Sequence, residues 1–169
     1  ACPFCTGSEG ETPPETDAIR RDGSAPTTPG WTVRAFPNKF AAWHHHEVLA
    51  EGPDHGEQPS SLGEDLWRDV LELAARRCLA MEADPEVEVA FWFRNVGREA
   101  GASICHNHSQ IMGMPELPPR LATPLERWRQ GADGGALGAA AERAAHDGRS
   151  VWQDERLAVF SPEVPKLPF

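Results

Sequence analysis

The sequence predicts an α+β fold in which helices pack on one face of a mostly antiparallel sheet. Two segments with the alternating pattern of strands precede a segment with helical periodicity, and further strand patterns follow it. Strands that come in succession, rather than in strict alternation with helices, favour this class over a parallel α/β sheet. A second helical segment and a hairpin complete the chain, and we find no internal repeat within the 169 residues.

Length and charge limit the class of protein. The 169 residues are enough for one domain with a real core, and the formal net charge is −10. This acidity argues against a nucleic-acid partner, because such a surface needs clustered Lys and Arg. The longest strongly apolar run, residues 89–93, is too short to cross a membrane. No signal peptide is evident, although the chain begins at Ala1 and can lack an upstream segment, and we expect a cytoplasmic protein.

The first third of the chain predicts a long loop and two strands. Residues 8–30 are rich in Glu, Pro, Thr and Gly without a period, which is typical of a loop with at most a short strand at 18–21. Residues 31–36 and 47–51 have the strand pattern, and each ends at a Pro-containing turn. The triplet His44 to His46 is usually solvated or a loop metal scavenger, so we assign it no role.

The middle of the chain predicts a helix followed by a strand. Ser61 with Glu64 three residues later has the capping-box pattern, and apolar residues recur at helical spacing to about residue 81. Residues 86–95 have the strongest strand pattern. One face of that strand takes Val87, Val89, Phe91 and Phe93.

The stretch 101–111 is the most indicative of a functional site. On a strand, the two-residue period places His106, His108 and Gln110 on one face. Nearby glycines and an apolar continuation favour a strand over a helix, and we expect it to pair antiparallel with 86–95. Two imidazoles and an amide in a row favour a site, although a lone His pair is more often surface decoration or a satisfied core group.

The last third predicts helices and a hairpin. Residues 124–146 are mostly helical in pattern, with a break at Gly134 and Gly135. Residues 150–160 predict a hairpin whose turn lies near Asp154 and Glu155.

Cysteine usage points to a metal or a redox pair near the N-terminus. Cys2 and Cys5 form a Cys-Pro-Phe-Cys knuckle, for which a metal site and a redox dithiol are both open. A redox pair is expected at a helix N-terminus after a strand, whereas a Gly- and Pro-rich stretch follows here. This context favours metal binding over a redox pair.

Five motifs follow one another over about 110 residues: Cys2-Pro-Phe-Cys5, Phe36-Pro-Asn-Lys-Phe40, Glu47-Val-Leu-Ala-Glu-Gly-Pro-Asp-His55, Arg94-Asn95-x-Gly97-x-x-x-Gly101-Ala-Ser103 and His106-x-His-x-Gln110. In this order they resemble the galactose-1-phosphate uridylyltransferase family of the histidine-triad superfamily. The resemblance implies a histidine-triad-like fold. It also implies that residues 1–149 form a first repeat with an N-terminal zinc knuckle, and residues 150–169 the opening strands of a possible second repeat.

The resemblance implies one zinc ion, bound by Cys2, Cys5, His55 and His106. Two thiolates and two imidazoles suit a closed tetrahedral site, which is structural rather than catalytic. Without the resemblance, His55 would be taken for a surface histidine after a Pro-Asp turn. Zinc in this place would clamp the knuckle to the strand that carries His108.

The resemblance also implies the reaction. His108 would attack the α-phosphorus of a nucleoside-diphosphate sugar, and the nucleoside monophosphate would pass through a nucleotidyl-histidine to a sugar 1-phosphate. Imidazole suits this role because it is substantially neutral at about pH 7 and leaves again readily. Gln110 would assist catalysis, and the family implies a homodimer. The implied substrate-binding residues are Asn38, Lys39, Phe40, Asn95, Gly101, Ser103 and Gln110.

The third position of the motif favours transfer over hydrolysis, because hydrolytic histidine-triad members typically carry His where this chain has Gln110. Asn107 replaces the Pro common in the family, and little of the second repeat is covered, so the sugar stays open. Two alternatives remain, a nucleoside-diphosphate-sugar phosphorylase and a non-catalytic zinc-stabilised nucleotide-binding module. HNH nucleases share the letters His-Asn-His, but there the three residues are dispersed, and the acidity of the chain opposes DNA binding.

Overall fold

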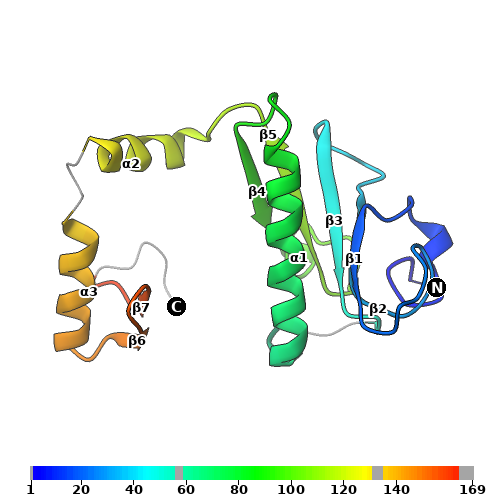
Figure 1. The fold of residues 1–169 in the computed structure, drawn as a ribbon, viewed down its shortest axis with the longest axis horizontal. Helices are drawn as coiled ribbons and strands as arrows, with labels where there is room; N and C mark the ends of the chain where they lie inside the picture. The colour runs from blue at the N-terminus through cyan, green and yellow to red at the C-terminus, as the bar shows by residue number, and fades with distance from the viewer. Residues whose placement is uncertain (1, 56–58, 131–134, 164–169) are drawn as a thin grey trace. The chain divides into compact units, whose positions relative to one another are not determined.

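The computed structural model describes residues 2–55, 59–130 and 135–163 (Figure 1). The chain forms two compact units, residues 1–117 and 118–169. The sequence predicts a repeat boundary at residue 149 instead, and that boundary stays a prediction because compactness does not test it. None of the described helices combines the length and apolar character needed to cross a membrane.

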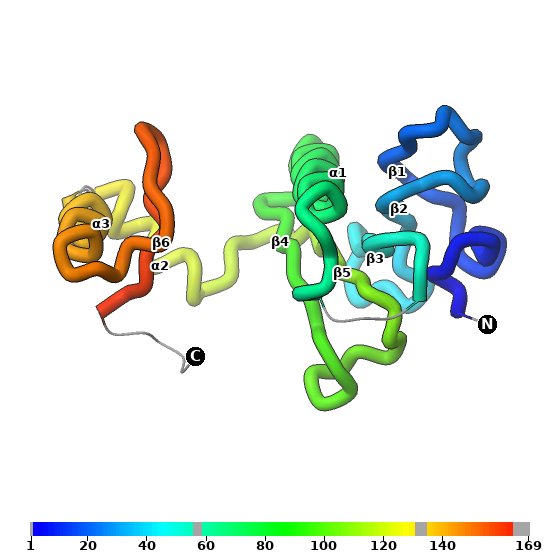
Figure 2. The backbone as a smooth tube through the Cα atoms, turned by 90° about the horizontal axis from the view of Figure 1, so that it is seen from below, coloured from blue at the N-terminus to red at the C-terminus, as the bar shows by residue number. Residues whose placement is uncertain are grey.

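The first unit is built around a five-stranded sheet with the strand order β1-β2-β3-β5-β4. All four neighbouring pairs are antiparallel, which confirms the predicted α+β class. A single long helix runs alongside the strands (Figures 1 and 2). The elements are β1 (Asp17–Arg20), β2 (Trp31–Pro37), β3 (His45–Glu51), α1 (Glu64–Glu82), β4 (Val89–Phe93) and β5 (His108–Met114).

The register of the central strand β3 decides which side chains share a face. Leu49 lies opposite Ala35 of β2 and Ser109 of β5, so these three point to the same side of the sheet. The apolar stripe of α1 packs on that side. The resulting core contains Val33, Ala35, Leu49, Val70, Leu73, Ala74, Met81 and Ile111.

The opposite face carries a second apolar core under the N-terminal segment. Phe4 packs on Phe36 of β2 with ring centroids 5.3 Å apart. Because side chains alternate along β5, His108 and Gln110 point to this second face. The sheet therefore separates the helix-covered core from the face of the predicted site. The buried members of the second core are Phe4, Trp31, Phe36, Val48 and Ala50.

The predicted elements of this unit are confirmed with shifted ends. β3 begins at His45, two residues earlier than predicted, and β4 is shorter than the predicted 86–95. The prediction of a capping box at Ser61 is wrong. Ser61 is the last residue of a 3₁₀ turn that begins at Pro59, and Gly63 is the N-cap of α1.

The prediction that His106 lies on the same strand as His108 is also wrong. β5 begins at His108, and His106 lies in a bend before it. The Asn107 carbonyl still accepts the Glu51 amide at 2.9 Å. The carbonyl of His106 instead accepts a hydrogen bond from the His108 ring at 2.8 Å. The backbone hydrogen bonds between β3 and β5 therefore start at Asn107, one residue after the bend.

The second unit comprises α2 (Pro119–Arg129), α3 (Ala136–His146) and a hairpin of β6 (Ser150–Gln153) and β7 (Ala158–Phe160). The hairpin is confirmed, and the Asp154 carboxylate closes its turn by accepting the amides of Arg156 and Leu157. α3 packs against both strands. The predicted helical segment is confirmed as two helices, and Gly134 of its predicted break lies outside the described residues.

Candidate active site and metal centre

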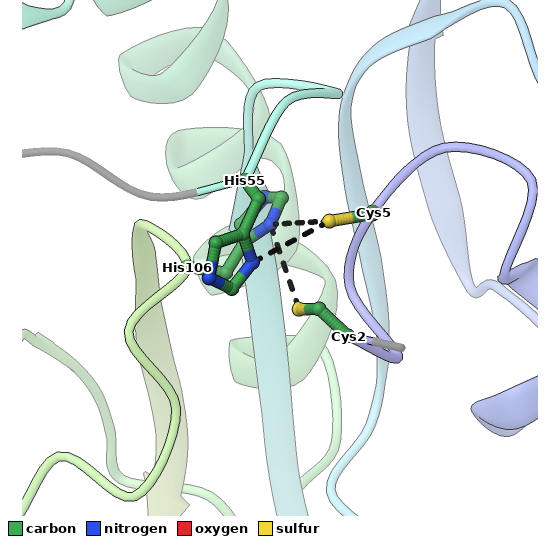
Figure 3. Close-up of side chains that lie close together, drawn as sticks. All are labelled: Cys2, Cys5, His55 and His106. Carbon is green, nitrogen blue, oxygen red and sulfur yellow. Dashed lines mark hydrogen bonds between the residues drawn. The ribbon is translucent and has the colours of Figure 1, made fainter.

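Four side chains from three distant segments of the chain meet in one cluster (Figure 3). Cys2 and Cys5 lie in an N-terminal turn, which the Cys5 amide closes on the Cys2 carbonyl at 3.3 Å. His55 follows β3, and His106 precedes β5. The four ligand atoms lie within 4.8 Å of one another. These are the four residues that were predicted to bind metal.

Three of the six distances between the ligand atoms fit tetrahedral coordination, and all six lie within 4.8 Å. Nδ1 of His106 lies 3.8 Å from Sγ of Cys2 and 3.6 Å from Sγ of Cys5, and Nδ1 of His55 lies 3.5 Å from Sγ of Cys5. Metal bonds of about 2.0–2.3 Å give tetrahedron edges of about 3.3–3.8 Å. The cluster can therefore hold one tetrahedrally coordinated metal ion.

The His106 ring is prepared for such a bond. Its Nε2 lies 2.8 Å from the carbonyl oxygen of Gly52, and because only a protonated nitrogen can donate to a carbonyl, the lone pair of Nδ1 faces the cysteines. The ring is buried, and burial lowers the pKa of His106, although the Gly52 carbonyl opposes the shift. Burial thus favours the neutral form of the ring, which is the form that binds metal.

The His108 ring, two residues further on, has a defined orientation. Its Nδ1 lies 2.8 Å from the carbonyl oxygen of His106, so Nδ1 carries the proton and Nε2 keeps its lone pair. The ring also meets Phe4 edge-on, with centroids 5.3 Å apart. The main chain of a metal-ligand candidate therefore orients a ring nitrogen that has a free lone pair.

His108 and Gln110 open into a pocket on the second face of the sheet. Part of its wall is apolar, formed by Pro3, Phe4, Phe36, Val48 and Ile104. His108 also lines an adjoining cavity with Asn95, Arg94 and Arg98. The structure thus brings the predicted substrate residues around one ring, because the first pocket also contains Asn38, Lys39, Phe40, Gly101, Ser103 and Gln110.

Sequence reasoning missed His46, to which it assigned no role. His46 is buried, and its Nε2 lies 2.8 Å from Oε1 of Gln110. Nδ2 of Asn38 lies 3.2 Å from the same oxygen. Alternation along β3 could have indicated this, because His46 shares a face with Val48 whereas His45 points to the other side.

A buried ion pair lies on the helix side of the site. Glu51, the last residue of β3, is bound by Arg94, whose guanidinium lies 4.8 Å from the ring centroid of Trp67 on α1. Burial raises the pKa of the Glu51 carboxyl, and the charge of Arg94 opposes that shift. Because the Glu51 amide donates to Asn107, the pair supports the segment that leads into β5.

The fold and the site together define a histidine-triad-like protein, with a two-histidine segment at the start of the inner strand β5 and a pocket in front of it. The chain belongs to the family described as domain of unknown function DUF4931, N-terminal domain, which matches residues 1–117. It is also homologous to galactose-1-phosphate uridylyltransferases.

Two curated relatives are similar over much of the chain. ADP-glucose phosphorylase from Arabidopsis thaliana is 27% identical over 148 residues, which are 75% of this chain and 41% of the relative. Galactose-1-phosphate uridylyltransferase from Streptomyces lividans is 32% identical over 107 residues, 61% of this chain and 30% of the relative. The chain spans less than half the length of each of these two.

Solved structures share the fold. A crystal structure of an ADP-glucose phosphorylase from Arabidopsis thaliana with bound ADP-glucose has a TM-score of 0.72 at 24% identity, over 93% of this chain and 54% of that one. The crystal structure of a hypothetical histidine triad nucleotide-binding protein from Sulfolobus tokodaii has a TM-score of 0.53 at 20% identity, over 69% of this chain and 71% of that one. The predicted histidine-triad-like fold is thereby confirmed.

Proposed function

We propose that this chain carries the active site of a nucleotidyltransferase. It moves a nucleoside monophosphate from a nucleoside-diphosphate sugar to a sugar 1-phosphate, as a hexose-1-phosphate uridylyltransferase does. The observation that carries the proposal is the orientation of His108, whose Nδ1 is bound to the His106 carbonyl and which lines a pocket together with Gln110. Relatives named for chemistry on sugar nucleotides and sugar phosphates support it.

In the first half-reaction, Nε2 of His108 attacks the α-phosphorus of the donor. The N–P bond forms, the P–O bond to the β-phosphate breaks, and the sugar 1-phosphate leaves. The ring gains positive charge, which the hydrogen bond from Nδ1 to the His106 carbonyl stabilises. The Gln110 amide donates to a non-bridging oxygen, and the Ser103 hydroxyl with main-chain amides near Gly101 cradles the phosphates.

In the second half-reaction, a phosphate oxygen of the acceptor attacks the same phosphorus. The N–P bond breaks, and Nε2 of His108 regains its lone pair. The nucleoside lies in the partly apolar pocket beside Lys39 and Phe40, and the sugar phosphate lies in the adjoining cavity with Asn95. Because donor and acceptor use the site in turn, ping-pong kinetics are expected.

Zinc is the metal that we assign to Cys2, Cys5, His55 and His106. Two sulfurs and two ring nitrogens in tetrahedral spacing are the donor set of structural zinc sites. All four positions come from protein side chains, so the ion when bound supplies rigidity. It ties the N-terminal turn to the bend that aims His108.

The second candidate function is a sugar-nucleotide phosphorylase, in which inorganic phosphate replaces the sugar 1-phosphate as acceptor. The similarity to ADP-glucose phosphorylase over 75% of this chain favours it. The covalent step on His108 would be the same in both reactions. Only the second half-reaction separates the two candidates.

A homodimer and a cytoplasmic location are part of the proposal. β4 is an edge strand with one strand neighbour among the described residues, and such an edge can accept a strand from a second copy. A reducing compartment keeps the thiols of Cys2 and Cys5 available as ligands. Sedimentation velocity would measure the oligomeric state.

The test is to trap the covalent intermediate. The protein is incubated with UDP-, ADP- or GDP-glucose and no acceptor, and the intact mass is measured. We expect a stoichiometric nucleotidyl adduct on His108 that is acid-labile and base-stable, as a phosphoramidate is. Adding glucose 1-phosphate or inorganic phosphate then shows which acceptor discharges it.

Matched variants make this test specific. His108→Asn should abolish the adduct and lower turnover by up to about a million-fold, while metal content and melting temperature stay close to wild type. His45→Asn, beside the site face but on the other side of β3, should form the adduct normally. Label on His106 or Cys105 would overturn the roles, and no adduct with any donor would leave a non-catalytic nucleotide-binding module.

A further inference from the structure

The turn at residues 38–42 fixes two polar side chains with its own backbone amides. The Phe40 amide donates to Oδ1 of Asn38 at 2.9 Å, so the amide nitrogen of Asn38 faces away from the turn. The Ala42 amide donates to Nδ1 of His46 at 3.0 Å. A neutral His46 ring must then carry its proton on Nε2. Because a backbone N–H can only donate, these two contacts fix the orientation of the Asn38 amide and the tautomer of the His46 ring.

Both side chains converge on the amide oxygen of Gln110. Nε2 of His46 donates to Oε1 at 2.8 Å, and Nδ2 of Asn38 donates to the same oxygen at 3.2 Å. Nδ2 of Asn38 also lies 3.2 Å from Nε2 of His46; both nitrogens carry protons in this assignment, so they share Oε1 of Gln110 as their acceptor. A reversed Gln110 amide would set its NH₂ group against these two donors and leave them without an acceptor. Oε1 is fully used, and the NH₂ group of Gln110 remains for the pocket that also contains His108.

We propose that His46 is a positioning residue that holds the Gln110 amide with its NH₂ group toward the reacting phosphoryl group. This inference rests on the proposed function, in which that NH₂ group donates to a non-bridging oxygen. If the amide were free to rotate, its carbonyl oxygen would face the phosphoryl charge part of the time, and the stabilisation would be lost.

The surroundings of His46 suit a fixed donor. The ring is 7% exposed, and the ring of Phe93 lies beside it with centroids 6.5 Å apart. The turn that holds His46 also lines the pocket through Lys39 and Phe40. The same turn therefore lines the proposed binding pocket for the sugar nucleotide and, through its backbone amides, orients the side chains that hold Gln110.

Two substitutions separate the two nitrogen atoms of the ring. In His46→Asn, the side-chain oxygen can still accept the Ala42 amide, but the shorter side chain brings no N–H group to Gln110, whose Oε1 keeps only the longer contact with Asn38. In His46→Gln, an amide NH₂ group can take the place of Nε2. We expect His46→Asn to slow adduct formation by about tenfold to a hundredfold, with a smaller change in the KM for the donor, and His46→Gln to recover most of the rate.

A double-mutant comparison distinguishes positioning from general support of the fold. In a Gln110→Ala background, His46→Asn should cause no further loss of rate, because the group that it aims is gone. His45→Asn should match wild type throughout. Equal losses in both backgrounds, or no rescue by His46→Gln, would overturn the inference.

A measurement without turnover keeps the inference separate from the proposed function. Nitrogen NMR of the ¹⁵N-labelled full chain should show His46 with its proton on Nε2, and one fixed Gln110 amide that becomes averaged in His46→Asn. A proton on Nδ1, or a Gln110 signal unchanged by the substitution, would overturn the positioning role. If wild type forms no adduct yet these signals appear, the proposed function fails and the orientation of Gln110 stands.

Discussion

His106 shows how much of the site depends on single residues. Its Nδ1 faces the cysteines, its Nε2 donates to Gly52, and its carbonyl holds the ring of His108. Side chain and main chain thus serve different parts of the site. A metal bound at the ring would restrict the bend, and the bend in turn fixes the orientation of the His108 ring, the proposed nucleophile.

The side chain of Gln110 predicts whether the nucleotidyl group of the proposed intermediate passes to an acceptor or to water. An amide can hold a phosphoryl oxygen but cannot take a proton from water, whereas an imidazole can do so. Gln110→His should therefore raise hydrolysis of the nucleotidyl group about tenfold or more relative to transfer, measured as the ratio of free nucleoside monophosphate to exchanged sugar nucleotide. Gln110→Asn, a shorter amide, should slow both reactions without changing that ratio, and an unchanged ratio in Gln110→His would disprove the assigned role.

The buried pair of Glu51 and Arg94 predicts a pH-dependent loss of stability. Arg94→Met leaves Glu51 without its cation, which should cost about 3–5 kcal/mol at about pH 7. Burial already holds the pKa of Glu51 above its ordinary value of 4.5, and the substitution raises it further. As pH rises above 4.5, the unfolded carboxyl ionises before the folded one, so stability falls with pH until the folded pKa is passed.

Urea unfolding of the Arg94→Met protein at about pH 4.5 and pH 7 would measure this effect. The destabilisation should be smaller at the lower pH, where the Glu51 carboxyl is protonated in the folded protein. The double variant Glu51→Gln with Arg94→Met is the control, because it has no buried carboxyl and should lose the extra pH dependence. A penalty equal at both pH values would mean that Glu51 is not the group responsible.

At the scale of elements, the N-terminal segment has contacts of its own besides the cysteines. The buried guanidinium of Arg34 on β2 donates to the Pro3 carbonyl at 3.3 Å and to the Thr12 hydroxyl at 3.0 Å. The Trp31 indole donates to the Glu9 carboxylate at 2.8 Å. The segment is therefore docked on β2 independently of any metal, and the metal would fix only its end.

Loss of the metal should thus lower stability without unfolding the protein. We expect about one zinc per chain by elemental analysis, and at free zinc about 1,000-fold above Kd the bound ion stabilises by about 4 kcal/mol. Cys2→Ser should lose the zinc and that stability, with activity falling as a consequence. Cys105→Ser removes an exposed cysteine next to His106 and should keep both. A Cys2→Ser protein that melted like wild type would rule out the structural role.

The elements also show what sequence could and could not predict. Alternation and helical spacing predicted the strands and α1, because the spacing of apolar residues along the sequence shows which side of a strand or helix faces the core. The bend at His106 was missed, since it depends on the Gly52 carbonyl and on the ring of His108. His46 was missed because three adjacent histidines suggested a solvated run, whereas β3 is the central strand and buries alternate positions on each face.

At the scale of the whole molecule, the apolar cores are unequally distributed between the two units. Every buried residue of the two core clusters lies in residues 1–117. Among the described residues after 117, Ala144 is the one buried hydrophobic side chain. Val151 and Trp152 in the hairpin are 74% and 50% exposed. Burial is the main source of stability, so the first unit holds nearly all of it.

This distribution predicts how the two units behave when they are separated. A fragment of residues 1–117 keeps both cores, the four metal-ligand candidates, His46, His108 and Gln110. It should fold cooperatively, bind metal, and differ from the full chain by less than about 2 kcal/mol in unfolding free energy. The fragment 118–169 is below the size at which a single core usually suffices, and circular dichroism should show it largely unfolded.

The same pair of fragments tests where the chemistry resides. If the first unit holds the complete donor site, fragment 1–117 should form the nucleotidyl adduct at a rate within about tenfold of the full chain, because no residue of the pocket that contains His108 and Gln110 lies beyond residue 117 among those described. An adduct that forms only in the full chain, with metal content equal in both proteins, would mean that residues 118–169 contribute to the donor site.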